Sequence, residues 1–269
     1  DVNATANFLF SQSGANVTFS ASSIPRSLIL SGALQALDGS SMTFNSPSAN
    51  MQAAGLNLGS GSNISLNSST TAIVNQISVG TAAGGMNTLI VTGSGLIGSA
   101  SNTLNRIGVA ANSPGTMTIR NNSLADLNDN AGSVLRIAGS AINSTGFVNI
   151  ETGSRLDAAN ITVGTPLSAG FTNSDGTMTI SGINSQVNQL GASTLQVGGI
   201  AGSSSDGRIN LNSGSFTSGT GLTTINELGT VQINGGIWNA NGNMTVHGSV
   251  SQGSGEFNFA SGRTLQIEN

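Results

Sequence analysis

A short phrase recurs along the chain at a spacing of about 30 residues. GTMTI stands at 115–119 and again at 176–180, and the related GRINL stands at 207–211. Five such phrases end at residues that lie 28, 31, 30 and 31 positions apart, namely Val91, Ile119, Ile150, Ile180 and Leu211. Repeats of 20 to 50 residues are typical of solenoids and related arrays, so this spacing constrains the fold more than any other feature.

Two further phrases accompany each copy of the first. The second ends in glycine and reads ISVG at 77–80, NRIG at 105–108, LRIAG at 135–139, ITVG at 161–164 and LQVGG at 195–199. The third is weaker and contains Leu96 and Ile97, Leu124 and Leu127, Leu156, Val187 and Leu190, and Phe216. Within the phrases apolar and polar residues alternate with a period of two, which indicates short strands. Gly, Asn, Asp and Ser between the phrases indicate turns, and SDG before Thr177 and Arg208 predicts the same turn in two units.

Three short strands in each unit can bury their apolar rows by coiling, with each coil stacked on the previous one. The sequence therefore predicts an all-β fold, a right-handed single-stranded parallel β-helix with three strands in each coil of about 30 residues. We expect one domain over 1–269, with N-terminal coils or a cap over 1–75, the best-formed repeats over 76–220 and C-terminal coils over 221–269. About nine coils would make a rod of about 45 Å. A short amphipathic capping helix over 25–37 is an alternative for that stretch.

The two GTMTI copies predict the orientation of individual side chains. Met117, Ile119, Met178 and Ile180 should point into the coil, and the threonines between them should point outward. Calcium-binding glycine-rich nonapeptides are absent from the sequence. The regular threonine column of an ice-binding surface is interrupted, because the intervening unit reads FVN at 147–149.

Composition restricts the classes of function. Charged residues make up 7% of the 269 residues, all seven basic residues are Arg, and the net charge is −4, so the chain has no basic stripe for nucleic acid. The absence of Cys removes disulfides and thiolate sites and fits an exported bacterial protein. No stretch approaches the roughly 20 apolar residues of a membrane helix, so membrane insertion is not expected.

The acidic residues offer one candidate site. Asp126 and Asp129 lie in DLNDN, which reads first as a turn and second as a carboxylate pair for sugar hydrolysis or calcium. A carbohydrate-active enzyme would need these two acids and Asp157 to converge beside an exposed aromatic such as Trp238. His247 is the only histidine and is expected at a solvent-facing strand end. We predict no catalytic, cofactor-binding or metal site.

Two arginines occupy equivalent places in consecutive units. Arg106 precedes IG and Arg136 precedes IAG, so we expect them to be outward neighbours on adjacent coils, with Glu151 or Asp157 as counterions. Candidate glycosylation sites are the sequons at Asn63, Asn67, Asn143, Asn160 and Asn243.

The segment GTMTISGINSQVNQLGASTLQVGGIAGSSSDGRINLNSGSF at 176–216 resembles the degenerate β-strand repeats of bacterial autotransporter passenger domains and related large exported surface proteins. The likeness extends over about 77–216. It implies a secreted or surface-anchored β-helix with a role as stalk, adhesin or matrix component.

The expected function is that of a non-enzymatic extracellular or cell-surface protein, a rigid stalk or adhesin whose partners are other copies of itself, a polysaccharide or a cell surface. A sharper variant is end-to-end self-assembly into a fibre or sheath. The apolar phrases ANFLFS at 6–11 and NVTFSAS at 16–22 would then pair with RTLQIEN at 263–269 of another copy. The alternative is a carbohydrate-active enzyme or a sugar-binding β-helix module. No cofactor is expected.

Overall fold

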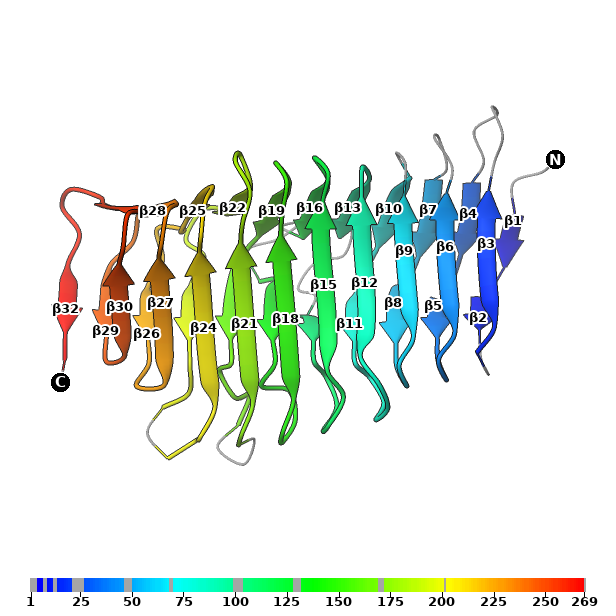
Figure 1. Ribbon diagram of the computed structural model, residues 1–269, viewed down its shortest axis with the longest axis horizontal. Helices are drawn as coiled ribbons and strands as arrows, with labels where there is room; N and C mark the ends of the chain where they lie inside the picture. The colour runs from blue at the N-terminus through cyan, green and yellow to red at the C-terminus, as the bar shows by residue number, and fades with distance from the viewer. Residues whose placement is uncertain are drawn as a thin grey trace.

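The computed structural model describes residues 4–6, 9–11, 14–20, 27–45, 50–67, 70–98, 104–127, 132–168, 172–200 and 202–268. All regular elements within these residues are β-strands, arranged in three parallel sheets. In Figure 1 the chain rises along the front sheet, descends behind it through the other two, and advances from right to left. This path is a right-handed β-helix with three strands in each coil.

Sheet A contains the first strand of each coil. Each strand pairs in parallel with the equivalent strands of the neighbouring coils. Its strands are β1 (Ala4–Ala6), β4 (Ser27–Leu30), β7 (Asn50–Ala53), β10 (Thr71–Val74), β13 (Gly95–Gly98), β16 (Leu124–Leu127), β19 (Arg155–Ala158), β22 (Gln186–Gln189), β25 (Ser215–Thr217), β28 (Ile237–Ala240) and β31 (Glu256–Phe259).

Sheet B contains the second strand of each coil. Its strands are β2 (Leu9–Ser11), β5 (Ala33–Ala36), β8 (Gly55–Leu58), β11 (Ile77–Val79), β14 (Leu104–Ile107), β17 (Val134–Ile137), β20 (Asn160–Val163), β23 (Leu195–Val197), β26 (Thr223–Ile225), β29 (Met244–Val246) and β32 (Leu265–Ile267).

Sheet C contains the third strand and includes both GTMTI copies. Its strands are β3 (Asn16–Ser20), β6 (Ser41–Asn45), β9 (Asn63–Asn67), β12 (Asn87–Thr92), β15 (Gly115–Arg120), β18 (Thr145–Ile150), β21 (Asp175–Ile180), β24 (Asp206–Leu211), β27 (Gly229–Ile233) and β30 (Ser249–Gln252).

The strand register confirms the repeat. The five residues that end the recurring phrase are direct partners from strand to strand, in the order Val91, Ile119, Ile150, Ile180 and Leu211. The glycine-ending phrases and the weaker third phrases form sheets B and A, as predicted.

The expected number of about nine coils is wrong. Sheets A and B each have eleven strands among the described residues, and sheet C has ten. Coils near the ends are shorter than 30 residues, because Ser41 pairs with Asn63 and Thr230 pairs with Ser249 only 19 residues further along. Eleven levels at roughly 4.8 Å make a rod of about 50 Å.

The capping helix considered for 25–37 is not formed by the described part of that stretch. Residues 25 and 26 lie outside the described residues, and the rest contains β4 and β5. Strand β5 alternates between buried and partly exposed residues, with Leu34 and Ala36 buried, and it pairs with β8. Pairing with the neighbouring coil therefore overrides the local helical pattern.

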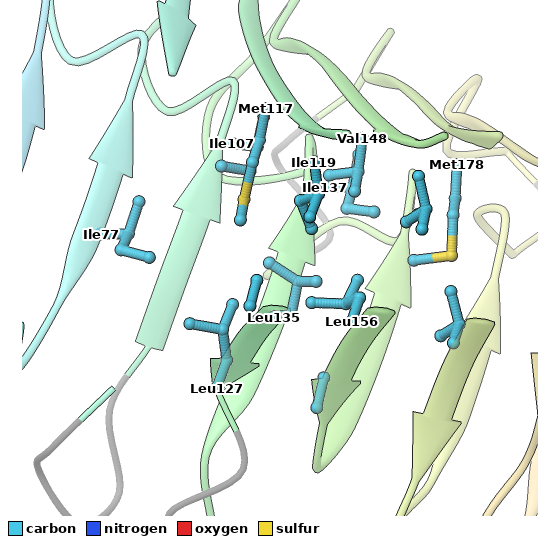
Figure 2. Close-up of a cluster of buried hydrophobic side chains, with 14 of the residues drawn as sticks. Ile77, Ile107, Met117, Ile119, Leu127, Leu135, Ile137, Val148, Leu156 and Met178 are labelled. Carbon is cyan, nitrogen blue, oxygen red and sulfur yellow. The ribbon is translucent and has the colours of Figure 1, made fainter. Parts of the chain in front are cut away.

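The inward rows form a continuous apolar core along the coil axis (Figure 2). Met117, Ile119, Met178 and Ile180 are fully buried, as predicted from the GTMTI copies. The alternating threonines of those strands are partly exposed on the outer face. At about 25 cal/mol for each Å² of apolar surface buried, this core supplies the main force for stacking the coils.

Serine side chains form buried columns at the corners between sheets. Ser144 Oγ donates to Ser174 Oγ at 3.2 Å, and the backbone N–H of Ser174 donates to Ser205 Oγ at 3.2 Å. At another corner, Ser94 N–H donates to Ser123 Oγ at 3.2 Å. These hydroxyls bond to backbone groups that no strand pairs, so the corners are polar but satisfied.

Glycine at the start of each sheet C strand allows the corner to close. A methyl group at Gly176 would collide with the backbone N of Gly164 and the carbonyl O of Ile137. Gly164 itself has a φ of 64°, which an L side chain rarely adopts. SDG is therefore not the predicted turn, because Asp175 and Asp206 already begin β21 and β24.

Candidate functional site

The outer face of sheet A brings two of the predicted acids together. Asp126 of β16 is the direct register partner of Asp157 of β19, so both carboxylates lie on one face of adjacent strands. Asp129, the third acid of the predicted groove, lies outside the described residues.

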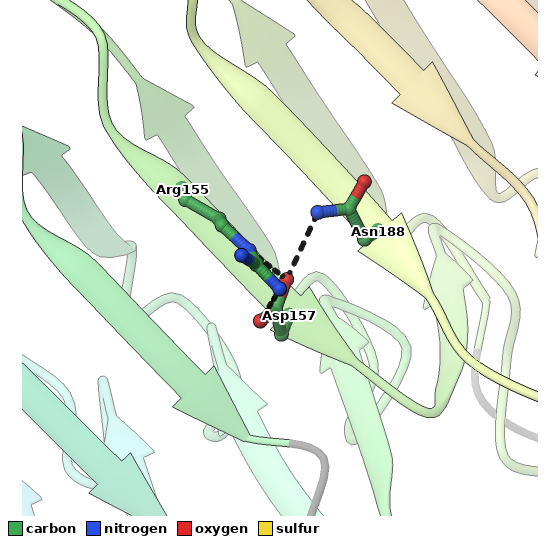
Figure 3. Close-up of polar contacts among 3 residues, drawn as sticks. All are labelled: Arg155, Asp157 and Asn188. Atoms are coloured by element: carbon green, nitrogen blue, oxygen red, sulfur yellow. Dashed lines mark hydrogen bonds and ion pairs between the residues drawn. The ribbon is translucent and has the colours of Figure 1, made fainter.

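Asp157 is held by two neighbours (Figure 3). Arg155 Nε donates to its Oδ1 at 2.7 Å and Arg155 Nη2 lies 2.6 Å from Oδ2, while Asn188 Nδ2 donates to Oδ1 at 3.1 Å. The carboxylate is 4% exposed as part of its residue, whereas half of the Arg155 side chain is in solvent. The hydrogen bond to Asp157 is the main cause that raises the pKa of Arg155 above its ordinary value.

The aromatic part of the predicted sugar groove is wrong. Trp238 is 1% exposed and points into the core, where it meets Phe216 and Phe257 edge to face at centroid distances of 5.7 and 5.4 Å. The alternation of β28 places Trp238 in the inward row, because its register partners on both neighbouring strands are these two phenylalanines.

Amide side chains continue the outer row of sheet A toward the C-terminus. Asn188 is followed in register by Thr217, Asn239 and Asn258, and Asn258 Nδ2 donates to Asn239 Oδ1 at 3.1 Å. Such a row presents hydrogen-bonding groups at the strand spacing of about 4.8 Å.

The arginine pair lies on the outer face of sheet B. Arg106 of β14 and Arg136 of β17 are direct register partners, which confirms that they are neighbours on adjacent coils. The predicted counterions are wrong as far as the described contacts go. Asp157 pairs with Arg155 on sheet A, and Glu151 forms no ion pair with either guanidinium.

His247 follows β29 at the C-terminal end of the rod. Its Nδ1 lies 3.2 Å from Glu268 Oε2, and both side chains are partly exposed. The position agrees with the expected solvent-facing strand end. Within the described ranges, no group of three or more His, Cys, Asp or Glu side chains could hold a metal ion.

The five sequon asparagines differ in accessibility. Asn143 and Asn243 are exposed, whereas Asn63 and Asn67 are partly buried strand residues. Asn160 uses its amide in the structure, since Nδ2 donates to Ser133 O and Oδ1 accepts from the backbone N–H of Thr194. The geometry thus makes Asn143 and Asn243 the most accessible acceptors, and glycosylation itself stays a prediction.

The last coil presents apolar side chains at the end of the rod. Leu265 is 42% exposed and Ile267 is 69% exposed, both on β32, whose only partner among the described strands is β29. An open pocket of about 250 Å³ lies there, lined by Met244, Val246, Gly248, Ser249, Val250, Phe257, Leu265 and Ile267. The phrase RTLQIEN therefore supplies a terminal strand, as predicted.

A second open pocket lies on the side of the rod, between the loops that follow β20 and β23. Its volume is about 390 Å³, and it is lined by Thr165, Pro166, Leu167, Ser168, Ile200, Gly202 and Ser203. The first of these loops also contacts the arginine pair, because Arg136 Nη1 donates to Thr165 O at 2.8 Å. No signal in the sequence pointed to this loop contact.

No protein-family model, no curated protein and no solved structure matches the chain. Among the described residues, none belongs to a helix long and apolar enough to cross a membrane. The class defined by the fold is the parallel β-solenoid with three strands in each coil.

Proposed function

We propose that the chain is a non-enzymatic extracellular or cell-surface structural protein that acts as a rigid stalk or adhesin. The observation that carries this proposal is the unbroken parallel ladder, which runs through sheets A and B from the first coil to the eleventh. Every coil is fixed to its neighbours by three strands and by the apolar core, so the rod resists bending and local unfolding.

The outer rows of the rod support a role in adhesion. They consist mainly of Thr, Ser, Asn and Gln, with a charged fraction of only 7% in the chain. Hydroxyl and amide groups at regular spacing suit many weak hydrogen bonds to polysaccharide or to other copies. The resemblance of 176–216 to bacterial autotransporter passenger domains supports an exported, surface-exposed location.

Gene deletion in the source cells tests the proposed role. Loss of the protein should weaken attachment to surfaces or cohesion between cells while growth in suspension stays unchanged. Full attachment and cohesion in the deletion strain would contradict the proposal.

End-to-end assembly is a sharper form of the same proposal, and the apolar C-terminal end favours it. Strands β31 and β32 expose one unpaired edge each, and β1 and β2 do the same at the opposite end of sheets A and B. Two copies in line would continue both ladders by strand addition and cover Ile267.

Charge at the C-terminal edge should prevent this assembly. Ile267→Asp places a carboxylate in the joint, so we expect the oligomers of the unaltered chain to dissociate by at least tenfold in concentration dependence. Light scattering after size exclusion measures the distribution. The matched control is Ile183→Asp, because Ile183 is 81% exposed midway along the rod. A strictly monomeric chain at high concentration would contradict end-to-end assembly.

A carbohydrate-active or sugar-binding module remains the alternative, favoured by one observation. Asp126 and Asp157 lie on one face of adjacent strands. Release of reducing ends from polysaccharides by the purified chain, abolished in Asp157→Asn, would support this alternative. Absence of release together with no binding to sugars would remove it.

A further inference from the structure

Four residues on adjacent strands form a row on the outer face of sheet B. Ser78, Arg106, Arg136 and Thr162 are successive register partners on β11, β14, β17 and β20. Two of the seven arginines of the chain are thus direct neighbours. Adjacent parallel strands are about 4.8 Å apart, so the two positive charges start from closely spaced backbone positions.

Three hydrogen-bond donors in this row lack an acceptor. Arg106 Nε, Arg136 Nε and Thr162 Oγ1 are buried and form no hydrogen bond within the described structure. Leaving a buried donor unpaired costs about 1–3 kcal/mol, more where the group is charged. Three such groups on three consecutive strands therefore indicate a common missing acceptor.

The charge of the row is also uncompensated. Arg136 is 9% exposed, and its one described hydrogen bond goes from Nη1 to the neutral carbonyl O of Thr165. Burial, and secondly the charge of Arg106, lower the pKa of Arg136 below its ordinary value. The nearest described acid pair, Arg155 with Asp157, belongs to the outer face of sheet A.

We propose that this row binds an oxyanion, a carboxylate, sulfate or phosphate group carried either by a free ion or by an acidic polysaccharide. Guanidinium groups bind such oxygens with two parallel hydrogen bonds, and one anion between two of them would offset their repulsion. Arg106 is the accessible member because it is partly exposed, and turning of its side chain uncovers the two Nε atoms. Thr165 O holds Arg136 in place, and the Thr162 hydroxyl completes the donor set.

The proposal does not depend on the structural role of the rod. It is tested by titration calorimetry at constant ionic strength with sodium sulfate, galacturonate, an oligogalacturonate and neutral maltohexaose. The unaltered chain should bind the anions and not maltohexaose. Tighter binding of the oligogalacturonate than of the single sugar identifies the polysaccharide as the source of the anion, and equal or sulfate-only binding identifies a free ion.

Variants separate the row from general charge effects. Arg106→Gln should weaken anion binding at least tenfold and leave the circular dichroism spectrum unchanged, because Arg106 is partly exposed. The control is Arg208→Gln, which removes the same charge from an exposed position on the outer face of sheet C and should bind as the unaltered chain does. Failure of the unaltered chain to bind any of the anions, or equal binding by Arg106→Gln, would overturn the proposal.

Discussion

A single hydrogen atom decides whether a coil can close at Gly176. The side chain of any other residue would meet the backbone of Gly164 and Ile137, which belongs to the preceding coil and cannot move without breaking strand pairs. We therefore expect Gly176→Ala to lower the free energy of unfolding by about 1–3 kcal/mol, as overpacking does elsewhere. Urea unfolding followed by circular dichroism measures the change.

Gly95→Ala is the control for this prediction. Gly95 begins β13, and a methyl group there would meet only Thr71 Oγ1 at 3.9 Å. Its stability should stay within about 0.5 kcal/mol of the unaltered chain. Equal losses in the two variants would show that glycine acts through the flexibility of the unfolded chain rather than through the corner contact.

Two acids are stacked at the start of sheet C. Asp175 and Asp206 are register partners, and burial, followed by the charge of Asp206, raises the pKa of Asp175 above its ordinary value. The folded state then holds its proton more tightly than the unfolded state, so stability falls as pH rises from about 4 through the raised pKa. Below about pH 4 both states are protonated and the cost disappears.

Asp175→Asn should therefore stabilise the protein at pH 7 by about 0.5 kcal/mol, the usual size of like-charge repulsion across strands. The gain should vanish near pH 3. Thermal unfolding at both pH values checks it, with the exposed loop residue Glu227 changed to Gln as the control. A gain of the same size at pH 3 would rule out repulsion between the two carboxylates.

At the scale of the strand, β28 shows how an aromatic residue stabilises the later coils. Trp238 packs between Phe216 of β25 and Phe257 of β31, so it joins three coils. Trp238→Ala should cost about 3–5 kcal/mol, measured by urea unfolding. Trp238→Phe should cost less, because it keeps an aromatic ring and removes an indole N–H that has no partner in the described structure. A loss below about 1 kcal/mol in Trp238→Ala would mean that the ring contributes little to stacking.

The strands of the middle coils could be predicted from the sequence because their period is nearly constant. Met117 and Met178 repeat the same phrase, so register and inward direction followed directly. The end coils lose loop residues while their strands persist, which hid two coils from an argument based on a 30-residue period. Buried serines such as Ser144 were missed, since a polar residue beside glycine reads as an exposed turn.

The candidate sites were predictable only where register alone placed the residues. Arg106 and Arg136 are neighbours as expected, because both precede the same glycine phrase. Their environment depends on the loop that contains Thr165, which lies in another coil and varies in length between coils. Trp238 was misplaced because its strand lies in the short coils, where the sequence does not fix which row faces inward.

As a whole molecule, the chain is a rod whose length follows from eleven stacked levels and whose two ends carry unpaired strands. Its sides are rich in hydroxyl and amide groups, and its C-terminal end is apolar. A rod of this kind transmits force along its axis, because every coil contributes strand pairs to the coils above and below it. The proposed role in an extracellular stalk, fibre or sheath rests on this arrangement.

Immunogold electron microscopy of the source cells and their secreted material tests that role most directly. With antibodies raised against the purified chain, the account predicts label outside the cell envelope, aligned along continuous fibres or a surface layer. Label confined to the cell interior, or dispersed in the medium without any fibre or surface layer, would contradict it.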